Sequence, residues 1–163
     1  MATKKLNSMR LLEQHGIPYE AITYGTPDAF HDATEVAEML GVPVDVVYKT
    51  LVVESAGSSK PCLALIAADR SLDLKRLAAV MGAKKVAMAA HKDAERLTGL
   101  KVGGISALAL THKNWPVYLD QLALEHEHIL VSAGQRGMQL RVPTAALVQL
   151  VRAKIADIST QQS

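Results

Sequence analysis

The alternation of apolar and polar positions predicts five helices separated by short polar breaks. Apolar residues recur three and four positions apart in each, which places them along one helix face. In the last segment this face is formed by Leu147, Leu150, Val151, Ile155 and Ile158. The helices are expected at 4–14, 32–41, 73–81, 92–98 and 144–158.

Local start and stop signals support three of these helices. Asp32 can cap the second helix, and Glu35 three residues later completes a capping-box pattern. Asp73 and Thr144 stand at the expected starts of the third and fifth helices in the same way. Gly41 is placed to end the second helix, because glycine adopts the left-handed conformation that closes helices.

Seven apolar segments predict strands. Two of them, 46–53 and 62–68, are nearly continuous apolar runs, which suit strands buried on both faces. Segments 55–61 and 134–137 are rich in glycine and serine or flanked by glycine, and are expected as a hairpin loop and a turn. The seven strands are expected at 19–24, 46–53, 62–68, 86–89, 117–120, 129–133 and 138–142.

The connections between these strands are mostly too short for parallel crossovers. We therefore expect a mixed α/β fold with a largely antiparallel or mixed sheet. A length of 163 residues with 49% hydrophobic and 21% charged residues predicts a single domain over 1–163. Aromatic residues make up only 4%, which predicts an aliphatic core and argues against a base-stacking platform built from several rings.

The net charge of +2 argues against a dedicated duplex-DNA-binding protein, which needs a strongly basic face. Any contact with nucleic acid should be local, at a terminus or a single nucleotide.

Cys62 is the only cysteine, so it can form no internal disulfide, and its apolar surroundings predict a core position. The first nine residues lack the apolar stretch of a secretion signal, and no segment nears a membrane span, which predicts a cytoplasmic protein.

Lys49 and a glycine pair are the first candidates for chemistry. Lys49 is the only charge between residues 46 and 53, and an ammonium in an apolar strand needs a partner, a ligand or a path to water. It either lies in a cleft facing an anionic or carbonyl oxygen, or extends to solvent from an edge strand. Gly103 and Gly104 interrupt an apolar segment before Ile105 and Ser106, where backbone N–H groups could hold an ester carbonyl or simply form a bend.

A third candidate is the turn Ser132–Gly137, where Arg136 between two glycines could meet a phosphate or remain a solvated hairpin residue. His31 precedes the second helix and could lie near a cleft. His126 and His128 fall on one strand face, but no third ligand has a recognisable spacing, so no metal is expected. No nucleophile elbow, phosphate loop or dinucleotide fingerprint is present, so no cofactor is expected either.

These segments, taken together and in order, resemble the YbaK/EbsC family, relatives of the editing insertion domain of bacterial prolyl-tRNA synthetase. The resemblance covers about 9–158. It is carried by Tyr24, Val36–Val42, Val47–Leu51, Leu72–Lys75, Gly82–Val86, Thr98–Gly99, Val102–Ser106 and Val131–Gly137.

The resemblance implies a curved, barrel-like sheet with flanking helices. It also implies hydrolysis of the ester that joins a wrong amino acid to the terminal adenosine of a tRNA, with cysteine on proline tRNA as the expected substrate. The acceptor end of the mischarged tRNA and prolyl-tRNA synthetase are the implied partners. Lys49 matches the family's essential lysine and would anchor the terminal nucleotide.

The matching positions also imply the rest of the site. Gly103, Gly104 and Ile105 match the backbone loop that holds the aminoacyl carbonyl, and Ser106 matches the serine of this loop. The remaining substrate-binding residues implied are Tyr24, His31, Ser132, Gly134, Arg136 and Gln139.

Two positions depart from the family pattern. Ala107 stands where proline is commoner, and Gln139 stands where cysteine-editing relatives carry an aspartate. An amide cannot act as a carboxylate base, so the amino acid removed remains open. Two alternatives to a tRNA deacylase also remain: a non-catalytic module that binds aminoacyl-tRNA or the synthetase, and a hydrolase of small esters or amides.

Overall fold

The computed structural model describes residues 5–58 and 60–162 as strands with helices on their outer faces. The five α-helices are α1 (Asn7–Gln14), α2 (Ala33–Leu40), α3 (Leu74–Met81), α4 (His91–Thr98) and α5 (Thr144–Val151). The strands are β1 (Glu20–Thr23), β2 (Tyr48–Ser55), β3 (Cys62–Ala67), β4 (Arg70–Leu72), β5 (Val86–Met88), β6 (Val117–Asp120), β7 (His128–Ser132), β8 (Met138–Pro143), β9 (Lys154–Ala156) and β10 (Ser159–Gln161).

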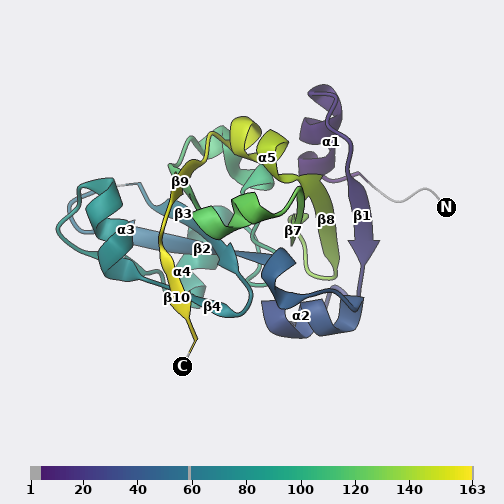
Figure 1. Ribbon diagram of the computed structural model, residues 1–163, viewed down its shortest axis with the longest axis horizontal. Coiled ribbons are helices and arrows are strands. Elements are labelled where there is room, and N and C mark those ends of the chain that lie inside the picture. The colour runs from purple at the N-terminus through teal and green to yellow at the C-terminus, as the bar shows by residue number, and fades with distance from the viewer. Residues whose placement is uncertain (1–4, 59, 163) are drawn as a thin grey trace.

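The strands form three open sheets. The largest has the order β5-β2-β3-β6-β9, in which the β2–β3 and β2–β5 pairs are antiparallel and the β3–β6 and β6–β9 pairs are parallel. A second sheet, β1-β8-β7, is antiparallel and lies beside α1 and α2, at the opposite end of the molecule from α3 (Figure 1). The third is the pair β10-β4.

The predicted mixed α/β class and mixed sheet are confirmed. The barrel-like closure is not confirmed, because none of the sheets in residues 5–58 and 60–162 closes on itself. A single parallel bridge between Val47 and Leu130 connects the start of β2 to β7. The two larger sheets also share one hydrophobic core, which includes Tyr48 of β2 and Leu140 of β8, and a crevice lined by residues of both sheets lies beside it.

The capped helices form as predicted. The Asp32 side chain accepts a hydrogen bond from the backbone N–H of Glu35 at 2.9 Å, with the reciprocal half of the capping box also present. The Asp73 side chain caps α3 by accepting a hydrogen bond from the backbone N–H of Arg76 at 3.0 Å, and Gly41 and Gly82 end their helices with positive φ angles. These elements were predictable because every signal lies within one helical turn of the end that it fixes.

The predicted first helix begins later than expected, and Lys4 lies outside the described residues. The loop expected at 55–61 likewise includes one residue, Ser59, outside them. Strand β3 is buried along its whole length, as its apolar run predicted. Strand β2 is only partly buried, since β5 covers no more than its last three residues and leaves the edge around Lys49 open.

The expected helix over 144–158 is wrong beyond Val151. Arg152 adopts φ 56° and ends the helix without the glycine that usually marks such a position. The chain then pairs β9 with β6 and β10 with β4, so that Ile155 lies in a strand. The predicted cap is also wrong, because Thr144 is the first helical residue and Pro143 occupies the cap position without a side-chain hydrogen bond.

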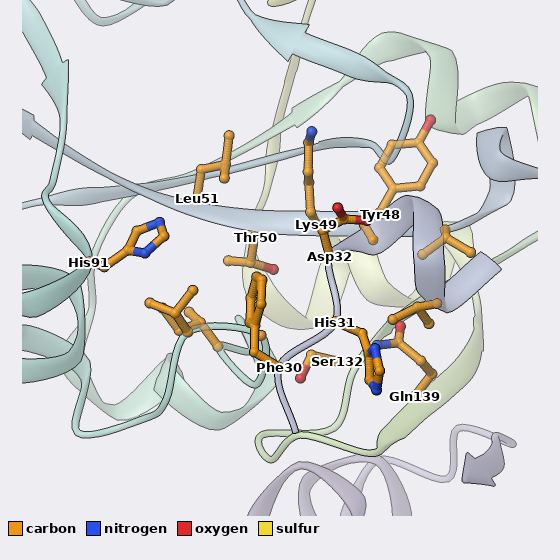
Figure 2. A pocket seen from close by; sticks show the side chains of 16 residues that line it. Phe30, His31, Asp32, Tyr48, Lys49, Thr50, Leu51, His91, Ser132 and Gln139 are labelled. Carbon is orange, nitrogen blue, oxygen red and sulfur yellow. The ribbon is translucent and has the colours of Figure 1, made fainter. Parts of the chain in front are cut away.

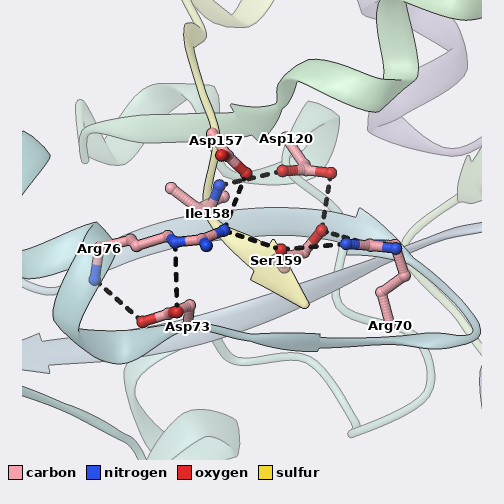
Figure 3. Close-up of polar contacts among 7 residues, drawn as sticks. All are labelled: Arg70, Asp73, Arg76, Asp120, Asp157, Ile158 and Ser159. Carbon is pink, nitrogen blue, oxygen red and sulfur yellow. Dashed lines mark hydrogen bonds and ion pairs between the residues drawn. The ribbon is translucent and has the colours of Figure 1, made fainter. Parts of the chain in front are cut away.

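A buried carboxylate explains why the chain leaves the helix. Asp120 is fully buried and accepts hydrogen bonds from the backbone N–H of Ile158 at 3.0 Å and from the hydroxyl of Ser159 at 2.8 Å. Arg70 on β4 donates to Ser159, and Arg76 pairs with Asp157 at 3.1 Å (Figure 3). These contacts between segments distant in sequence override the apolar periodicity of 144–158.

We expect Asp120→Ala to lower the free energy of unfolding by about 2–4 kcal/mol, because it leaves buried donors without an acceptor. The matched control is Asp157→Ala, which removes a pair that is mostly solvent-exposed and should change stability by less than about 1 kcal/mol. Urea unfolding of both variants measures the difference. Equal effects in the two variants would show that Asp120 does not hold this segment.

Candidate functional site

A cavity of about 200 Å³ occupies the crevice between the two larger sheets. Its walls come from the loop before α2, the exposed edge of β2, the start of α4, the 102–105 segment and the base of the β7–β8 hairpin (Figure 2). It is lined by Phe30, His31, Asp32, Ala33, Val36, Val47, Tyr48, Lys49, Thr50, Leu51, His91, Val102, Gly103, Ile105, Ser132 and Gln139.

Lys49 stands on the open edge of β2, opposite Ile66 of β3. Its ammonium donates one hydrogen bond, to the carbonyl oxygen of Ala68 at 3.3 Å, and no other is found in residues 5–58 and 60–162. Burial lowers the pKa of Lys49 from its ordinary value, while the nearby carboxylates of Asp32 and Asp69 oppose part of this shift. The lysine therefore holds an incompletely solvated cation with free donors beside the cavity.

The two glycines serve different purposes. Gly103 lines the cavity at φ +93°, a conformation that strains any other residue, and a Cβ there would lie 3.0 Å from the Phe30 ring. Gly104 lies outside the lining, and a Cβ there would come within 2.8–2.9 Å of the backbone of Gln135 and Arg136. Gly103 thus shapes the cavity wall, and Gly104 lets the loop pack directly against the β7–β8 turn.

Backbone donors are available in this loop. The N–H of Gly104 donates to the carbonyl of Lys101 at 2.7 Å, whereas those of Gly103 and Ile105 have no acceptor among the described residues. Unpaired backbone N–H groups beside a cavity can hold a carbonyl oxygen and stabilise the negative charge that develops on it.

The hairpin contributes a buried amide. Ser132 and Gln139 are directly paired across β7 and β8, and both line the cavity. Gln139 is only 5% exposed, and within the described part of the chain its Oε1 has no hydrogen-bond partner. A buried carbonyl oxygen without a partner costs free energy, which a ligand that donates a hydrogen bond would recover.

The loop before α2 adds His31 and Asp32 to the rim. His31 lies 3.4 Å from the Glu35 carboxylate, and the Tyr24 ring packs edge-on against it with 6.4 Å between ring centroids. The helix-capping hydrogen bond from the backbone N–H of Glu35 and the hydroxyl of Thr34 lower the pKa of Asp32. Asp32 is therefore engaged in capping α2 and is a poor general base.

The structure brings together part of the predicted site. Lys49, Gly103, Ile105, His31, Ser132 and Gln139 all line the cavity. Tyr24, Gly104, Ser106, Gly134 and Arg136 do not line it. Tyr24, Gly134 and Arg136 contact residues of the lining. Gly104 packs against the β7–β8 turn, and the hydroxyl of Ser106 is buried and has no partner in the residues described.

Arg136 was considered above as a phosphate ligand or a solvated hairpin residue, and in the structure it contacts the glycine loop and Phe30. Its Nε donates to the carbonyl of Val102 at 2.7 Å, and its guanidinium lies 5.5 Å from the centroid of the Phe30 ring. The arginine thereby ties the hairpin to the glycine loop.

Sequence reasoning missed Phe30, Thr50 and His91 as lining residues. Phe30 lies in an irregular loop, where periodicity carries no signal, and Thr50 is hidden among the apolar residues of β2. His91 begins α4 one residue before the predicted start. No group of three or more His, Cys, Asp or Glu side chains suited to a metal occurs within 5–58 and 60–162.

Comparison with known proteins places this fold and cavity in a class. Residues 27–150 match the family described as the aminoacyl-tRNA editing domain. The Enterococcus faecalis protein EbsC, named as a candidate Cys-tRNA(Pro)/Cys-tRNA(Cys) deacylase, is 38% identical over 159 residues, which cover 98% of this chain and 96% of EbsC. The chain belongs to the YbaK/EbsC family of aminoacyl-tRNA editing domains.

Two further relatives extend the comparison. The Escherichia coli protein ProXp-y, named a multifunctional Ser/Thr-tRNA deacylase, is 26% identical over 150 residues, 90% of this chain and 87% of ProXp-y. A solved structure of a candidate trans-editing enzyme for prolyl tRNA synthetase has a TM-score of 0.79 at 22% identity, covering 99% of this chain and all of that one. This structural similarity shows that the two proteins share a fold.

Proposed function

We propose that the protein is a trans-acting deacylase that hydrolyses the ester of a mischarged tRNA. The observation that carries this proposal is that Lys49, Gly103 and Ile105 line one cavity. Membership of the editing-domain family and the names of the relatives EbsC and ProXp-y support the same activity.

In this proposal Lys49 anchors the ribose or phosphate of the terminal nucleotide. The aminoacyl carbonyl lies against the 103–105 backbone, whose free N–H groups stabilise the oxyanion formed during attack on the ester. The amino acid then extends towards Ser132 and Gln139. This arrangement supplies positioning and electrostatic stabilisation, and it needs no protein nucleophile.

The attacking group depends on the amino acid. With cysteine, the substrate thiol attacks its own ester carbon, the ribose oxygen leaves with the thiol proton, and water later opens the thiolactone. With an amino acid that lacks a thiol, a water molecule held in the cavity attacks instead. We propose Cys-tRNA(Pro) as the principal substrate, since the EbsC relative carries that name at 38% identity.

Because of Gln139, serine and threonine are the main alternatives to cysteine as the amino acid that the protein removes. Its unpaired buried Oε1 can accept a hydrogen bond from a hydroxyl as well as from a thiol or ammonium group. The ProXp-y relative, named for Ser/Thr-tRNA, is consistent with such substrates. Prolyl-tRNA synthetase is the protein partner proposed, because it would deliver mischarged proline tRNA to a separate editing protein.

The test is a deacylation panel of Cys-, Ala-, Ser- and Thr-charged proline tRNA with the wild type and Lys49→Ala. We expect rapid ester loss for at least Cys-tRNA(Pro) with the wild type and near-background loss with the variant. Background loss in both proteins for every substrate would refute a deacylase. The second candidate is a binding module, which is favoured by the absence of a free carboxylate base among the lining residues. If no substrate is hydrolysed, tight binding of a non-hydrolysable aminoacyl-adenosine would support this candidate.

The pH dependence of activity should follow Lys49. Burial holds the pKa of Lys49 below the ordinary 10.5, so the ammonium is lost at a lower pH than that of an exposed lysine. We therefore expect kcat/KM to decline on the alkaline side before pH 10.5 is reached. Lys49→Arg, which stays charged throughout, should lose this decline, and an identical alkaline limb in both proteins would contradict the assignment.

A further inference from the structure

Phe30 is an unusual feature of the cavity rim. It is the only phenylalanine in a chain with few aromatic residues, and its side chain is 47% exposed. It lies on the loop between β1 and α2, and its ring stands among the lining residues near Thr50 and Ser132 (Figure 2). A large apolar ring held open to solvent at the entrance of a site suggests a ligand surface.

Two segments of the chain, the β7–β8 turn and the glycine loop, hold this ring in place. The guanidinium of Arg136 lies over the ring, and the same side chain is fixed by its hydrogen bond to the carbonyl of Val102. Gly103 has no Cβ, which leaves room for the ring to pack against the glycine loop. The ring is thus backed by a cation and by the loop that lines the cavity, while nearly half of its side chain remains free.

We propose that Phe30 is the platform on which the terminal adenine of the charged tRNA stacks; this inference rests on the proposed function. The ester is attached to the ribose that also carries the adenine. If the ester lies at Lys49 and Gly103, the base must lie one ribose away, at the rim. A cavity of about 200 Å³ is smaller than the range of about 300–1,000 Å³ typical of small-molecule sites, so the base stays outside it.

Stacking suits this ligand. The face of any base can stack on an aromatic ring, so the contact adds affinity without reading sequence. All tRNAs end in the same adenosine, so the platform needs no selectivity. The low aromatic content argued against a stacking platform built from several rings, but a single terminal base requires only one aromatic ring.

A binding experiment tests the contact without hydrolysis. Because the chain has one phenylalanine, incorporation of 4-fluorophenylalanine gives a single fluorine resonance from Phe30. We expect adenosine 5′-monophosphate to shift this resonance in a saturable way and ribose 5-phosphate, which lacks the base, to leave it nearly unchanged. No shift with the nucleotide, or the same shift with both ligands, would overturn the inference.

A kinetic experiment tests the role in turnover. Phe30→Ala should lower kcat/KM by about 5- to 150-fold, mainly through a higher KM, and Phe30→Trp should retain wild-type values. Leu124→Ala, at an exposed apolar side chain that does not line the cavity, is the matched control. Phe30→Ala behaving like this control would refute the platform, whereas an inactive wild type with a normal fluorine titration would refute only the proposed deacylase.

Discussion

Lys49→Met should lower kcat/KM for a mischarged tRNA by about 10²- to 10³-fold, the loss typical of removing one fixed donor from a preorganised site. The ammonium makes a single hydrogen bond within the described residues, and Lys49 is one of the residues that line the cavity. Methionine has a similar length and no charge, so the cavity keeps its shape and loses the cation. The measurement is single-turnover deacylation of Cys-tRNA(Pro).

The same substitution should raise the free energy of unfolding by about 1 kcal/mol, since a partly buried charge is replaced by an apolar group. The lowered pKa of Lys49 has the matching sign: the folded state disfavours the charged form, so protonation of Lys49 opposes folding. Greater stability combined with lost activity would identify a residue retained for function. Reduced stability would instead show that Lys49 is a structural residue of β2.

Lys75→Met is the matched control for both measurements. Lys75 is exposed on α3, at the opposite end of the molecule from the three-stranded sheet (Figure 1). Surface substitutions of this kind change stability by less than about 0.5 kcal/mol, and no change in rate is expected. A comparable loss of activity in this variant would mean that general surface charge, and not the charge in the cavity, holds the tRNA.

The sequence predicted those elements whose causes are local. The capping aspartates, the glycines that end α2 and α3, and the apolar run of β3 each act within a few residues. The end of the last helix could not be predicted, because Asp120, more than thirty residues away, binds Ile158 and Ser159. Apolar periodicity in 144–158 is compatible with both outcomes, and only the tertiary contact distinguishes them.

The candidate site was predictable in a similar, partial way. The ordered resemblance pointed to Lys49 and the glycine loop, and the structure brings Lys49, Gly103 and Ile105 to one cavity. It could not separate the residues that line the cavity from those that support it, such as Gly104. That distinction depends on the packing of the loop against the β7–β8 turn, which no single segment encodes.

Gly104→Ala should therefore reduce activity by about 10²-fold or more, although Gly104 does not line the cavity. Its Cβ would meet the backbone of Gln135 and Arg136 at 2.8–2.9 Å, and backbone cannot move aside as a flexible side chain can. The glycine loop must shift away from the hairpin, and displacements of about 1 Å cost roughly 10²-fold in rate. Overpacking of this kind also destabilises by about 1–3 kcal/mol.

Two alanine variants separate this clash from other effects of replacing a glycine. Gly57→Ala has φ +83° and no atom within 4 Å, so it measures backbone strain alone, without a clash and away from the cavity. Gly103→Ala combines the strain of φ +93° with a contact at 3.0 Å to the Phe30 ring, so its loss of activity reports on backbone strain and on the position of that ring, and not on a backbone clash. Deacylation and urea unfolding of the three variants give the comparison. Wild-type activity in Gly104→Ala would show that the loop does not depend on direct backbone packing against the hairpin, and the position of the ester-binding N–H groups would then need another cause.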